Sequence, residues 1–218
     1  MRIRYKPWAR KELEESSFYI DHPEEIRGKW IKQFKKEQPM HLELGCGKGS
    51  FIAQIACQHP NINYIAIDMV DPMLGLAKRN IEKVYSEKHR EIDNVIITRF
   101  DISRIKLMMD KQDCIDRIYI NFCNPWPKGK HRKKRLTHPK QLELYKIFLK
   151  PGGEIYFKTD DDSLFASSLL YFEESGFEII KKTYDLHSEN VPDNIETEHE
   201  KMFSEQGINI KALIAKLK

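Results

Sequence analysis

Short apolar runs that suit buried strands alternate with helical patterns along most of this chain. The strand patterns cover 41–44, 63–67, 94–99, 115–121 and 154–158, and the helical patterns cover 51–59, 71–88, 139–149 and 163–175, with a short helical piece around 105–109. Strands that alternate with helices connect through right-handed crossovers and form a mostly parallel sheet with both faces covered. The alternation therefore predicts an α/β fold.

Two more strand patterns, at 177–182 and 208–217, follow each other with no helix expected between them. Consecutive strands without a crossover pair antiparallel, so we expect a hairpin at one edge of the sheet. The connection 184–206 is too long for a turn, and loops of this length often carry function. The predicted architecture is a Rossmann-like, seven-stranded, mostly parallel sheet with an antiparallel edge hairpin and helices on both faces.

The length of 218 residues suits one domain with a terminal extension. We expect a basic N-terminal arm with a leading helix at 1–36 and the main domain at 37–218. Apolar runs such as 64–67 are far shorter than the roughly 20 residues of a membrane-spanning helix or the about 7–15 of a signal peptide. A cytoplasmic protein without membrane contact is therefore expected. The four cysteines form no Cys-x-x-Cys pair and no zinc spacing, and no metal site is predicted.

Positive charge is concentrated in two segments of the chain. Residues 1–11 hold five Lys or Arg and no acid, and residues 128–135 hold six more, whereas the remainder of the chain is net acidic. Segregation of this kind indicates two basic patches directed at a polyanion such as a nucleic acid.

A glycine cluster, Gly45-Cys-Gly47-Lys-Gly49, follows the first predicted strand of the main domain. Glycines at this place let the chain turn tightly into a helix and let a ligand approach the backbone. The cluster is not a P-loop, because Gly, Lys and Ser are not contiguous in the required order. It is not a nicotinamide-dinucleotide fingerprint either, because the third glycine position holds Ser50.

Three carboxylates, Glu43, Asp68 and Asp101, stand at the ends of three successive predicted strands. A carboxylate at the binding edge repels a pyrophosphate but suits a ligand that carries an ammonium and a sulfonium. The carboxylate of Asp68 can accept hydrogen bonds from the ribose hydroxyls of an adenosine, and that of Asp101 can accept one from the adenine amino group. We therefore predict an S-adenosylmethionine (SAM) site that includes Gly45 and Gly47. The alternative is local helix capping by these acids.

The fourth strand pattern of the main domain ends in Asn121-Phe-Cys-Asn-Pro-Trp-Pro-Lys128. Prolines stiffen this loop, and Trp126 beside the amide of Asn124 suits the stacking of a flat base; a buried tryptophan at a strand end is the alternative. The basic run that follows is expected to contact RNA phosphates, with an affinity that falls steeply with salt. The predicted RNA contacts are Lys130, Arg132, Lys133, Lys134 and Arg135.

Several segments of the chain resemble the bacterial tRNA (guanine-N7)-methyltransferase family. They are 1–8, 43–49, 119–128, 131–137, 157–160, 185–187 and 197–200. The resemblance covers essentially the whole chain in order. It implies a class I SAM-dependent methyltransferase that modifies a variable-loop guanine, with SAM as cofactor and tRNA as partner. Carried over by position, the cofactor contacts are Glu43, Asp68, Asp101 and Asn124, and the substrate side comprises Lys128, Asp160, Thr197, Glu198, His199 and Glu200.

Two positions depart from the family pattern, because most members have Asp where this chain has Asn124, and Glu where it has Asp68. Guanine N7 carries a lone pair and no proton, so methyl transfer needs alignment and a tolerated positive charge but no general base. We therefore predict that Asn124 is the catalytic residue, that it orients by hydrogen bonding, and that activity is retained. Asp160 or Glu200 could supply the negative charge.

Several of these residues also have a structural interpretation. Asp160 and the two acids after it could cap the next helix, and Thr197 and Glu200 have capping-box spacing. His187 is predicted to be a structural hydrogen-bonding histidine.

Two other functions stay open. One is methylation of an exocyclic amine, adenine N6 or cytosine N4, although those enzymes place Pro-Pro-aromatic after the Asn or Asp. The other is a non-catalytic RNA-binding protein that keeps the cofactor fold. No obligate protein partner is predicted, and the chain is expected to be a monomer or a homodimer.

Overall fold

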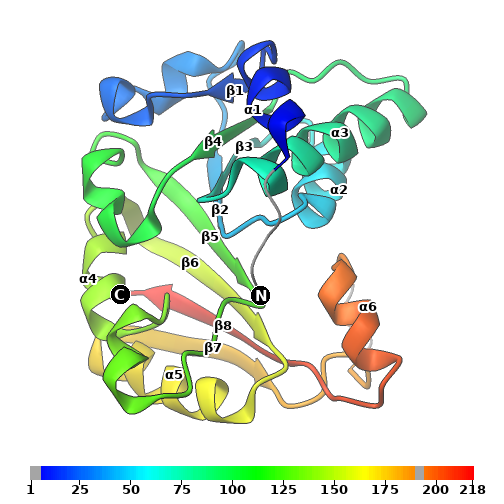
Figure 1. Ribbon diagram of the computed structural model, residues 1–218. Coiled ribbons are helices and arrows are strands. Elements are labelled where there is room, and N and C mark those ends of the chain that lie inside the picture. Colours follow the sequence, from blue (N-terminus) through cyan, green and yellow to red (C-terminus); the bar gives the residue numbers. More distant parts are fainter. Residues whose placement is uncertain (1–5, 190–193) are drawn as a thin grey trace. The chain divides into compact units, whose positions relative to one another are not determined.

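The computed structural model describes residues 6–189 and 194–218. The chain forms two compact units, Met1–Asp113 and Cys114–Lys218, and Figure 1 labels the helices and strands of both. No helix within the described ranges has both the length and the apolar character that a membrane span requires.

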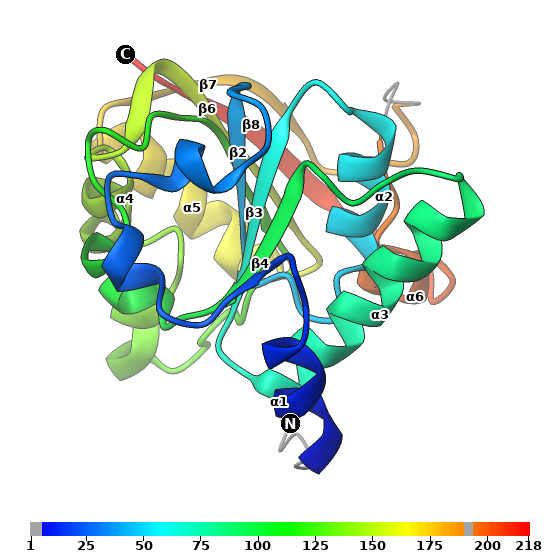
Figure 2. The ribbon, with the colours of Figure 1, turned by 90° about the horizontal axis from the view of Figure 1, so that it is seen from above.

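The first unit is built on four parallel strands in the order β1-β4-β3-β2. The strands are β1 (Tyr19–Ile20), β2 (Met40–Leu44), β3 (Asn63–Asp68) and β4 (Val95–Arg99). The helices are α1 (Pro7–Glu14), α2 (Ser50–Gln58) and α3 (Asp71–Glu87), and short 3₁₀ helices are η1 (Pro23–Ile26), η2 (Trp30–Gln33) and η3 (Ile102–Leu107). Figure 2 shows α2 and α3 on one face of this sheet and the segment with η1 and η2 on the other.

Helix α1 packs against α3 at Gly75. A Cβ atom there would lie 2.8 Å from the Trp8 ring and 2.9 Å from the Cβ of Ala9. The missing side chain thus lets the two helices approach closely. The guanidinium of Arg79 lies 3.8 Å over the Trp8 ring and its Nε donates to Glu12, so these contacts fix α1 to α3.

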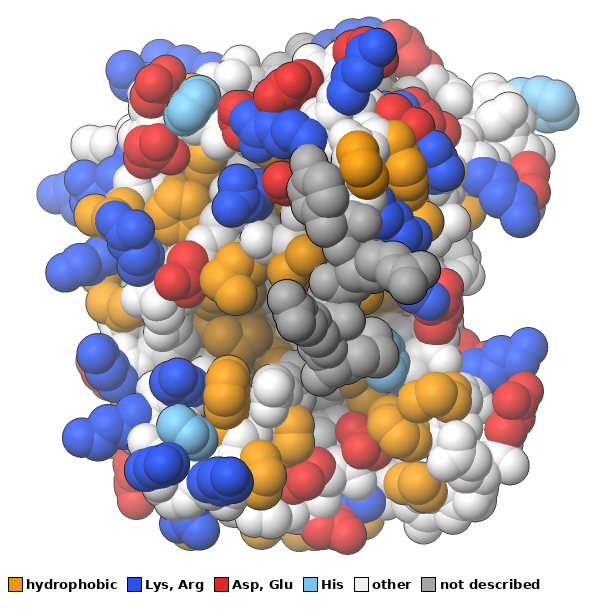
Figure 3. All heavy atoms as spheres, in the orientation of Figure 1, with side chains coloured by type: hydrophobic (Ala, Val, Ile, Leu, Met, Phe, Trp, Pro, Cys, Tyr) orange, Lys and Arg blue, Asp and Glu red, His pale blue; other side chains and the backbone are white. Residues whose placement is uncertain are grey.

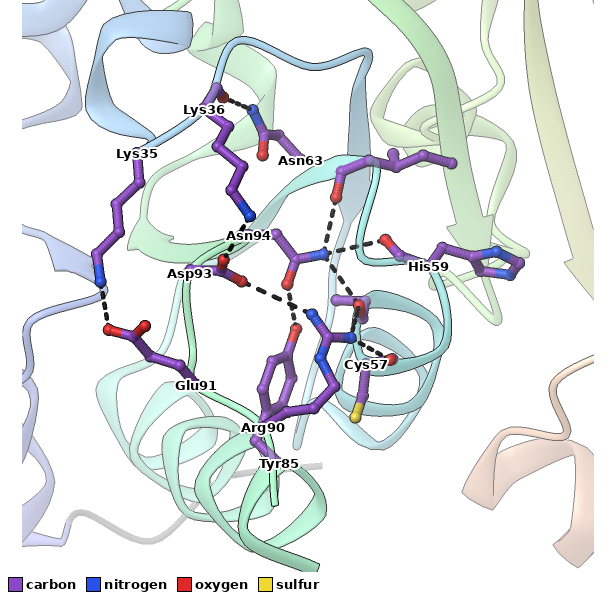
Figure 4. A network of polar contacts seen from close by, with 12 residues as sticks. Lys35, Lys36, Cys57, His59, Asn63, Tyr85, Arg90, Glu91, Asp93 and Asn94 are labelled. Carbon is purple, nitrogen blue, oxygen red and sulfur yellow. Dashed lines mark hydrogen bonds and ion pairs between the residues drawn. The ribbon is translucent and has the colours of Figure 1, made fainter. Parts of the chain in front are cut away.

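Asn94 ties four segments of the first unit together (Figure 4). Its side chain is buried, and its amide nitrogen lies 2.9, 3.1 and 2.8 Å from the carbonyl oxygens of Ala56, His59 and Ile62. Its amide oxygen accepts a 2.6 Å hydrogen bond from the hydroxyl of Tyr85. One amide thus satisfies buried groups at the end of α2, in the α2–β3 loop and on α3.

Ion pairs that are exposed or partly exposed surround this buried amide in Figure 4. Lys36 pairs with Asp93 at 3.3 Å, Lys35 pairs with Glu91, and Arg90 lies 3.6 Å from Asp93. Because exposed pairs contribute only about 0–1 kcal/mol each, the Asn94 amide is expected to dominate the stability of this network.

The second unit is built on four strands in the order β5-β6-β8-β7. The strands are β5 (Ile115–Asn121), β6 (Leu149–Thr159), β7 (Phe177–Thr183) and β8 (Lys211–Leu217); the helices are η4 (Gly129–Lys134), α4 (Pro139–Tyr145), α5 (Asp162–Glu174) and α6 (Glu198–Ser204). β5 and β6 are parallel, whereas β8 runs antiparallel to both β6 and β7. The expected edge hairpin is therefore confirmed, and α5 packs against its strands.

The structure differs from the sequence-based expectation in three elements. The described residues form eight strands rather than seven, because the two-residue β1 pairs with β4. Helix α4 ends at Tyr145 rather than near 149, because Leu149 already pairs with Ile115 and 150–153 continue β6. The connection 184–206 contains the helix α6, which the sequence analysis missed.

Candidate active site

The glycine turn links β2 to α2, and all three of its glycines have left-handed backbone angles. The φ values are +82° at Gly45, +54° at Gly47 and +73° at Gly49, a region in which L side chains are strained. A Cβ on Gly49 would lie 2.6 Å from the Cβ of Ala77 on α3, so this glycine permits close packing. At Gly45 and Gly47 nothing lies within 4 Å of the Cβ position. The turn therefore leaves open space beside two exposed stretches of backbone.

Two carboxylates flank this turn. Glu43 lies on β2 with only 2% of its surface exposed. Asp68 ends β3 and accepts hydrogen bonds from the backbone N–H groups of Gly47 and Val70, each at 3.0 Å. Burial raises the pKa of Asp68, while these N–H groups counteract the rise. Burial also raises the pKa of the Cys46 thiol well above its usual value, and the charges of Glu43 and Asp68 raise it further. The turn is thus a site of concentrated negative potential.

Asp101 begins η3 at the carboxyl end of β4. Its side chain accepts a 2.9 Å hydrogen bond from the N–H of Ser103, so the capping interpretation holds for this residue. It also lines an open pocket of about 520 Å³ together with Met69 and Phe100; the other lining residues are Arg10, Asp21, His22, Arg99 and Arg104. Met69 directly follows Asp68 and is 60% exposed. The pocket is thus lined mostly by charged or ionisable side chains, with Met69 and Phe100 as its apolar ones.

The first unit therefore fits SAM in two respects. The backbone at Gly45 and Gly47 is open where a Cβ would block a ligand, and the carboxylates of Glu43 and Asp68 lie beside this turn. Within the described ranges, no group of three or more His, Cys, Asp or Glu residues is arranged to hold a metal ion.

In the second unit, the turn after β5 is held by Asn124. The side chain of Asn124 is exposed, and its Oδ1 accepts a 3.0 Å hydrogen bond from the N–H of Trp126. Trp126 has a φ of +44° and Phe122 a φ of +52°. Such strained non-glycine residues cluster at functional sites, because the surrounding structure must hold them in place. The ring of Trp126 lies 5.7 Å from His131 and 4.9 Å from the ammonium of Lys134.

Most of the predicted RNA contacts lie on the surface, but Arg135 does not. Its side chain is 1% exposed, and its Nε donates a 2.7 Å hydrogen bond to the carbonyl of Pro125. A buried guanidinium cannot meet a phosphate backbone, so this expectation is corrected: Arg135 fixes the Pro125–Pro127 turn from within. The exposed cations of this segment are Lys128, Lys130, Arg132, Lys133 and Lys134. Figure 3 shows Lys and Arg side chains gathered in its lower left part.

The three acids after β6 have different roles. Asp161 caps α5, and its Oδ1 accepts a 2.6 Å hydrogen bond from the N–H of Leu164. Asp162 pairs with Lys211 at 2.7 Å, and the same ammonium donates to the backbone carbonyl of Asp160 at 3.0 Å. The carboxylate of Asp160 takes no part in the cap, which leaves it available as the substrate-side residue of the prediction.

The segment Thr197–Glu200 forms the capping box that its spacing predicts. The hydroxyl of Thr197 accepts a hydrogen bond from the N–H of Glu200, and the carboxylate of Glu200 accepts one from the N–H of Thr197. Glu200 is fully buried, and Nε2 of His187 lies 3.4 Å from its carboxylate, in agreement with a structural role for that histidine. Glu198 and His199 are exposed.

The sequence analysis missed three residues that contact predicted substrate-side residues: Phe122, Lys158 and Lys211 contact His199, Glu200 and Asp160. Lys158 and Lys211 belong to strands β6 and β8, where an alternating polar residue signals only a half-buried strand. Nothing in the pattern marks such lysines as buried, because their partners come from distant parts of the chain.

A family model described as "Putative methyltransferase" matches residues 37–213. Three similar curated proteins are each named tRNA (guanine-N(7)-)-methyltransferase. The one from Clostridium beijerinckii is 60% identical over 215 residues, 99% of this chain and 98% of that protein. The one from Clostridium perfringens strain SM101 is 58% identical over 217 residues, 99% of each. The one from Acetivibrio thermocellus is 50% identical over 218 residues, 100% of each.

Two solved structures share the fold. The 16S rRNA methyltransferase KamB has a TM-score of 0.60 at 14% identity, and an antibiotic-related methyltransferase has a TM-score of 0.57 at 16% identity; each comparison covers 99% of this chain and 95% of the other. At such identities the likeness concerns the fold alone, which is the Rossmann-like class I methyltransferase fold. This chain therefore belongs to the methyltransferase family whose model it matches, together with the bacterial tRNA (guanine-N(7)-)-methyltransferases that align with it along nearly its full length.

Proposed function

We propose that this protein methylates N7 of a guanine in the variable loop of tRNA, with SAM as the methyl donor. The observation that carries the proposal is the glycine turn, whose open backbone at Gly45 and Gly47 lies beside the carboxylates of Glu43 and Asp68. The near full-length similarity to tRNA (guanine-N(7)-)-methyltransferases supports the choice of substrate.

The first unit holds the donor in this proposal. Asp68 binds the ribose hydroxyls, Asp101 binds the adenine amino group, and the glycine turn leaves room for the rest of the molecule. SAM supplies an electrophilic methyl group on a positively charged sulfur. The buried carboxylate of Glu43 favours a ligand with positive charge, and its cost of burial is lowered when that charge is present.

The second unit holds the guanine. Asn124 orients the reacting atoms by hydrogen bonding, and Trp126 provides a flat surface on which a base stacks, worth about 1–3 kcal/mol. Because N7 carries no proton, no residue needs to act as a general base. Asp160 supplies negative charge near the cationic purine that forms, and Lys128 contacts the tRNA.

The variant Asn124→Asp is expected to keep the methyl-transfer rate within about tenfold of the unchanged protein. The alignment that Asn124 provides depends on its hydrogen bond to the N–H of Trp126, which an aspartate can also accept. The measurement is kcat with saturating SAM and tRNA. An increase of several orders of magnitude would show that a charge, rather than orientation, is what this position must supply.

Replacing Lys130, Lys133 and Lys134 by alanine is expected to weaken tRNA binding and to reduce the slope of log affinity against log salt. Each lost phosphate contact lowers that slope by about 0.7–0.9, so the three together lower it by roughly 2–3. A matched control replaces Lys181, Lys182 and Lys216, which are also exposed but lie on β7 and β8. SAM affinity is expected to be unchanged in both variants, and a slope that stays the same in the first would refute this RNA contact.

The direct test of the proposal is transfer of labelled methyl groups to unmodified tRNA, followed by digestion to nucleosides. We expect 7-methylguanosine, and no label in a tRNA whose variable-loop guanine is replaced by adenine. Labelled N6-methyladenosine or N4-methylcytidine would instead support exocyclic-amine methylation. Binding of tRNA without binding of SAM, measured by calorimetry, would support a non-catalytic RNA-binding protein.

We further propose that the protein works in the cytoplasm, where tRNA is found, and without an obligate protein partner, as a monomer or a homodimer.

A further inference from the structure

Lys158 is a largely buried lysine on β6 whose ammonium makes three hydrogen bonds. It lies near the carboxyl end of β6, opposite Asn121 of β5, and its side chain is 13% exposed. A lysine buried to this degree costs free energy unless its ammonium is fully paired. The partners of that ammonium therefore show what Lys158 holds.

The ammonium makes three hydrogen bonds to the short segment 194–200. It donates to Oδ1 of Asn194, to the carbonyl of Ile195 at 3.2 Å and to Oε2 of Glu200 at 3.0 Å. The other carboxylate oxygen of Glu200 accepts a 2.7 Å hydrogen bond from the amide of Asn194. Both oxygens of this carboxylate are occupied within the protein and Glu200 is 0% exposed, so a guanine cannot reach it to donate hydrogen bonds.

The backbone of Lys158 contacts a second segment, the turn after β5. Its carbonyl accepts a 2.9 Å hydrogen bond from the N–H of Phe122, the residue with φ +52° that begins the turn containing Asn124. The ring of Phe122 stacks on two rings of α6, with centroids 5.9 Å from His199 and 6.0 Å from Phe203. The turn after β5 and the segment 194–204 are therefore joined both through Lys158 and through Phe122.

We infer that Lys158 is a positioning residue for the substrate side: through the buried carboxylate of Glu200 it fixes the segment 194–204 against the turn that contains Asn124. Glu200 acts as the internal counter-ion of Lys158 and as the third helical residue of the capping box whose N-cap is Thr197, and its effect on the reaction passes through the position of α6. The inference rests on the proposed function and adds to it the residue that sets the geometry of the guanine side.

The main test compares Lys158→Met with Lys150→Met. Lys150 is a matched control because it also lies on β6 and also pairs with an acid, Asp116 at 2.8 Å, but is far from α6 in the strand. Lys158→Met is expected to lower kcat/KM for tRNA about 100-fold, the effect of misplaced reacting groups, while the Kd for SAM changes less than about twofold. Lys150→Met leaves both values near those of the unchanged protein. Lys158→Arg keeps the charge and recovers most of the loss.

A second measurement needs no substrate. Amide hydrogen exchange across α6 is expected to become faster in Lys158→Met and to stay the same in Lys150→Met. Glu200→Gln keeps the shape of the side chain but removes its charge. Should Lys158→Met fail to fold, this variant replaces it, and hydrogen exchange across α6 is again expected to become faster. In the double variant Lys158→Met/Glu200→Gln, the loss in kcat/KM is expected to be close to that of Lys158→Met alone, because the two residues act as one unit.

Three results would overturn the inference: unchanged exchange across α6, an unchanged kcat/KM for tRNA in Lys158→Met, or losses from the two substitutions that simply multiply. An unchanged protein that transfers no methyl group to tRNA would refute the proposed function instead, and the exchange experiment would still decide the role of Lys158.

Discussion

Replacing Gly45 by alanine is expected to weaken SAM binding about 100-fold. Gly45 has a φ of +82° and open space at the Cβ position. The added methyl group would occupy space that the donor needs, and loss of close approach between backbone and ligand removes favourable contacts. The measurement is the Kd for SAM by calorimetry, corrected for the fraction of folded protein.

A matched control separates this effect from backbone strain. Gly176 follows α5 with a φ of +78°, and it too has nothing within 4 Å of the Cβ position. Gly176→Ala is therefore expected to cost a similar free energy of unfolding, about 1–2 kcal/mol, and to leave SAM binding unchanged. Equal losses of SAM affinity in both variants would place the donor away from the glycine turn.

Replacing Asn94 by leucine is expected to lower the free energy of unfolding by about 3–5 kcal/mol. The change leaves the hydroxyl of Tyr85 and the carbonyls of Ala56, His59 and Ile62 without their shared partner, and each unsatisfied buried group costs about 1–3 kcal/mol. Some of these carbonyls can still form hydrogen bonds with water, so the total loss of stability is smaller than the sum of the individual costs. Urea denaturation of the isolated variant measures the loss.

The control for this prediction is Asn80→Leu. Asn80 lies on α3, and its amide donates to one carbonyl, that of Lys48, in an exposed hydrogen bond. The expected loss is below about 1 kcal/mol, because water replaces that partner. A loss in Asn94→Leu no larger than in Asn80→Leu would show that the Asn94 network does not hold the first unit together.

Much of the fold could be predicted from the sequence because its strands are short, buried and separated by clear helical patterns. The strand 63–67, the helix 71–88 and the edge hairpin were each predicted close to their observed bounds. The end of α4 was not, because Leu149 is apolar in either state and only its pairing with Ile115 makes it a strand residue. Two-residue β1 likewise exists only through its partner β4.

Some residues of the candidate site could likewise be predicted from the sequence, and others could not. Glu43, Asp68 and the glycines follow from local spacing at strand ends, so the sequence alone predicts them as candidate cofactor contacts, and the structure places the carboxylate of Asp68 against the N–H of Gly47. The burial of Arg135 could not be read from a run of basic residues, because it depends on the carbonyl of Pro125, a partner on the folded turn. Lys158 gave no signal at all, since its partners lie at 194–200 and only folding brings them together.

The most direct measurement of the central claim is a crystal structure with S-adenosylhomocysteine, the product of methyl transfer from SAM. The account predicts its ribose hydroxyls on the carboxylate of Asp68, its adenine beside Asp101 and its amino acid part over the open backbone of Gly45. A molecule bound elsewhere, with the glycine turn empty, would contradict the account.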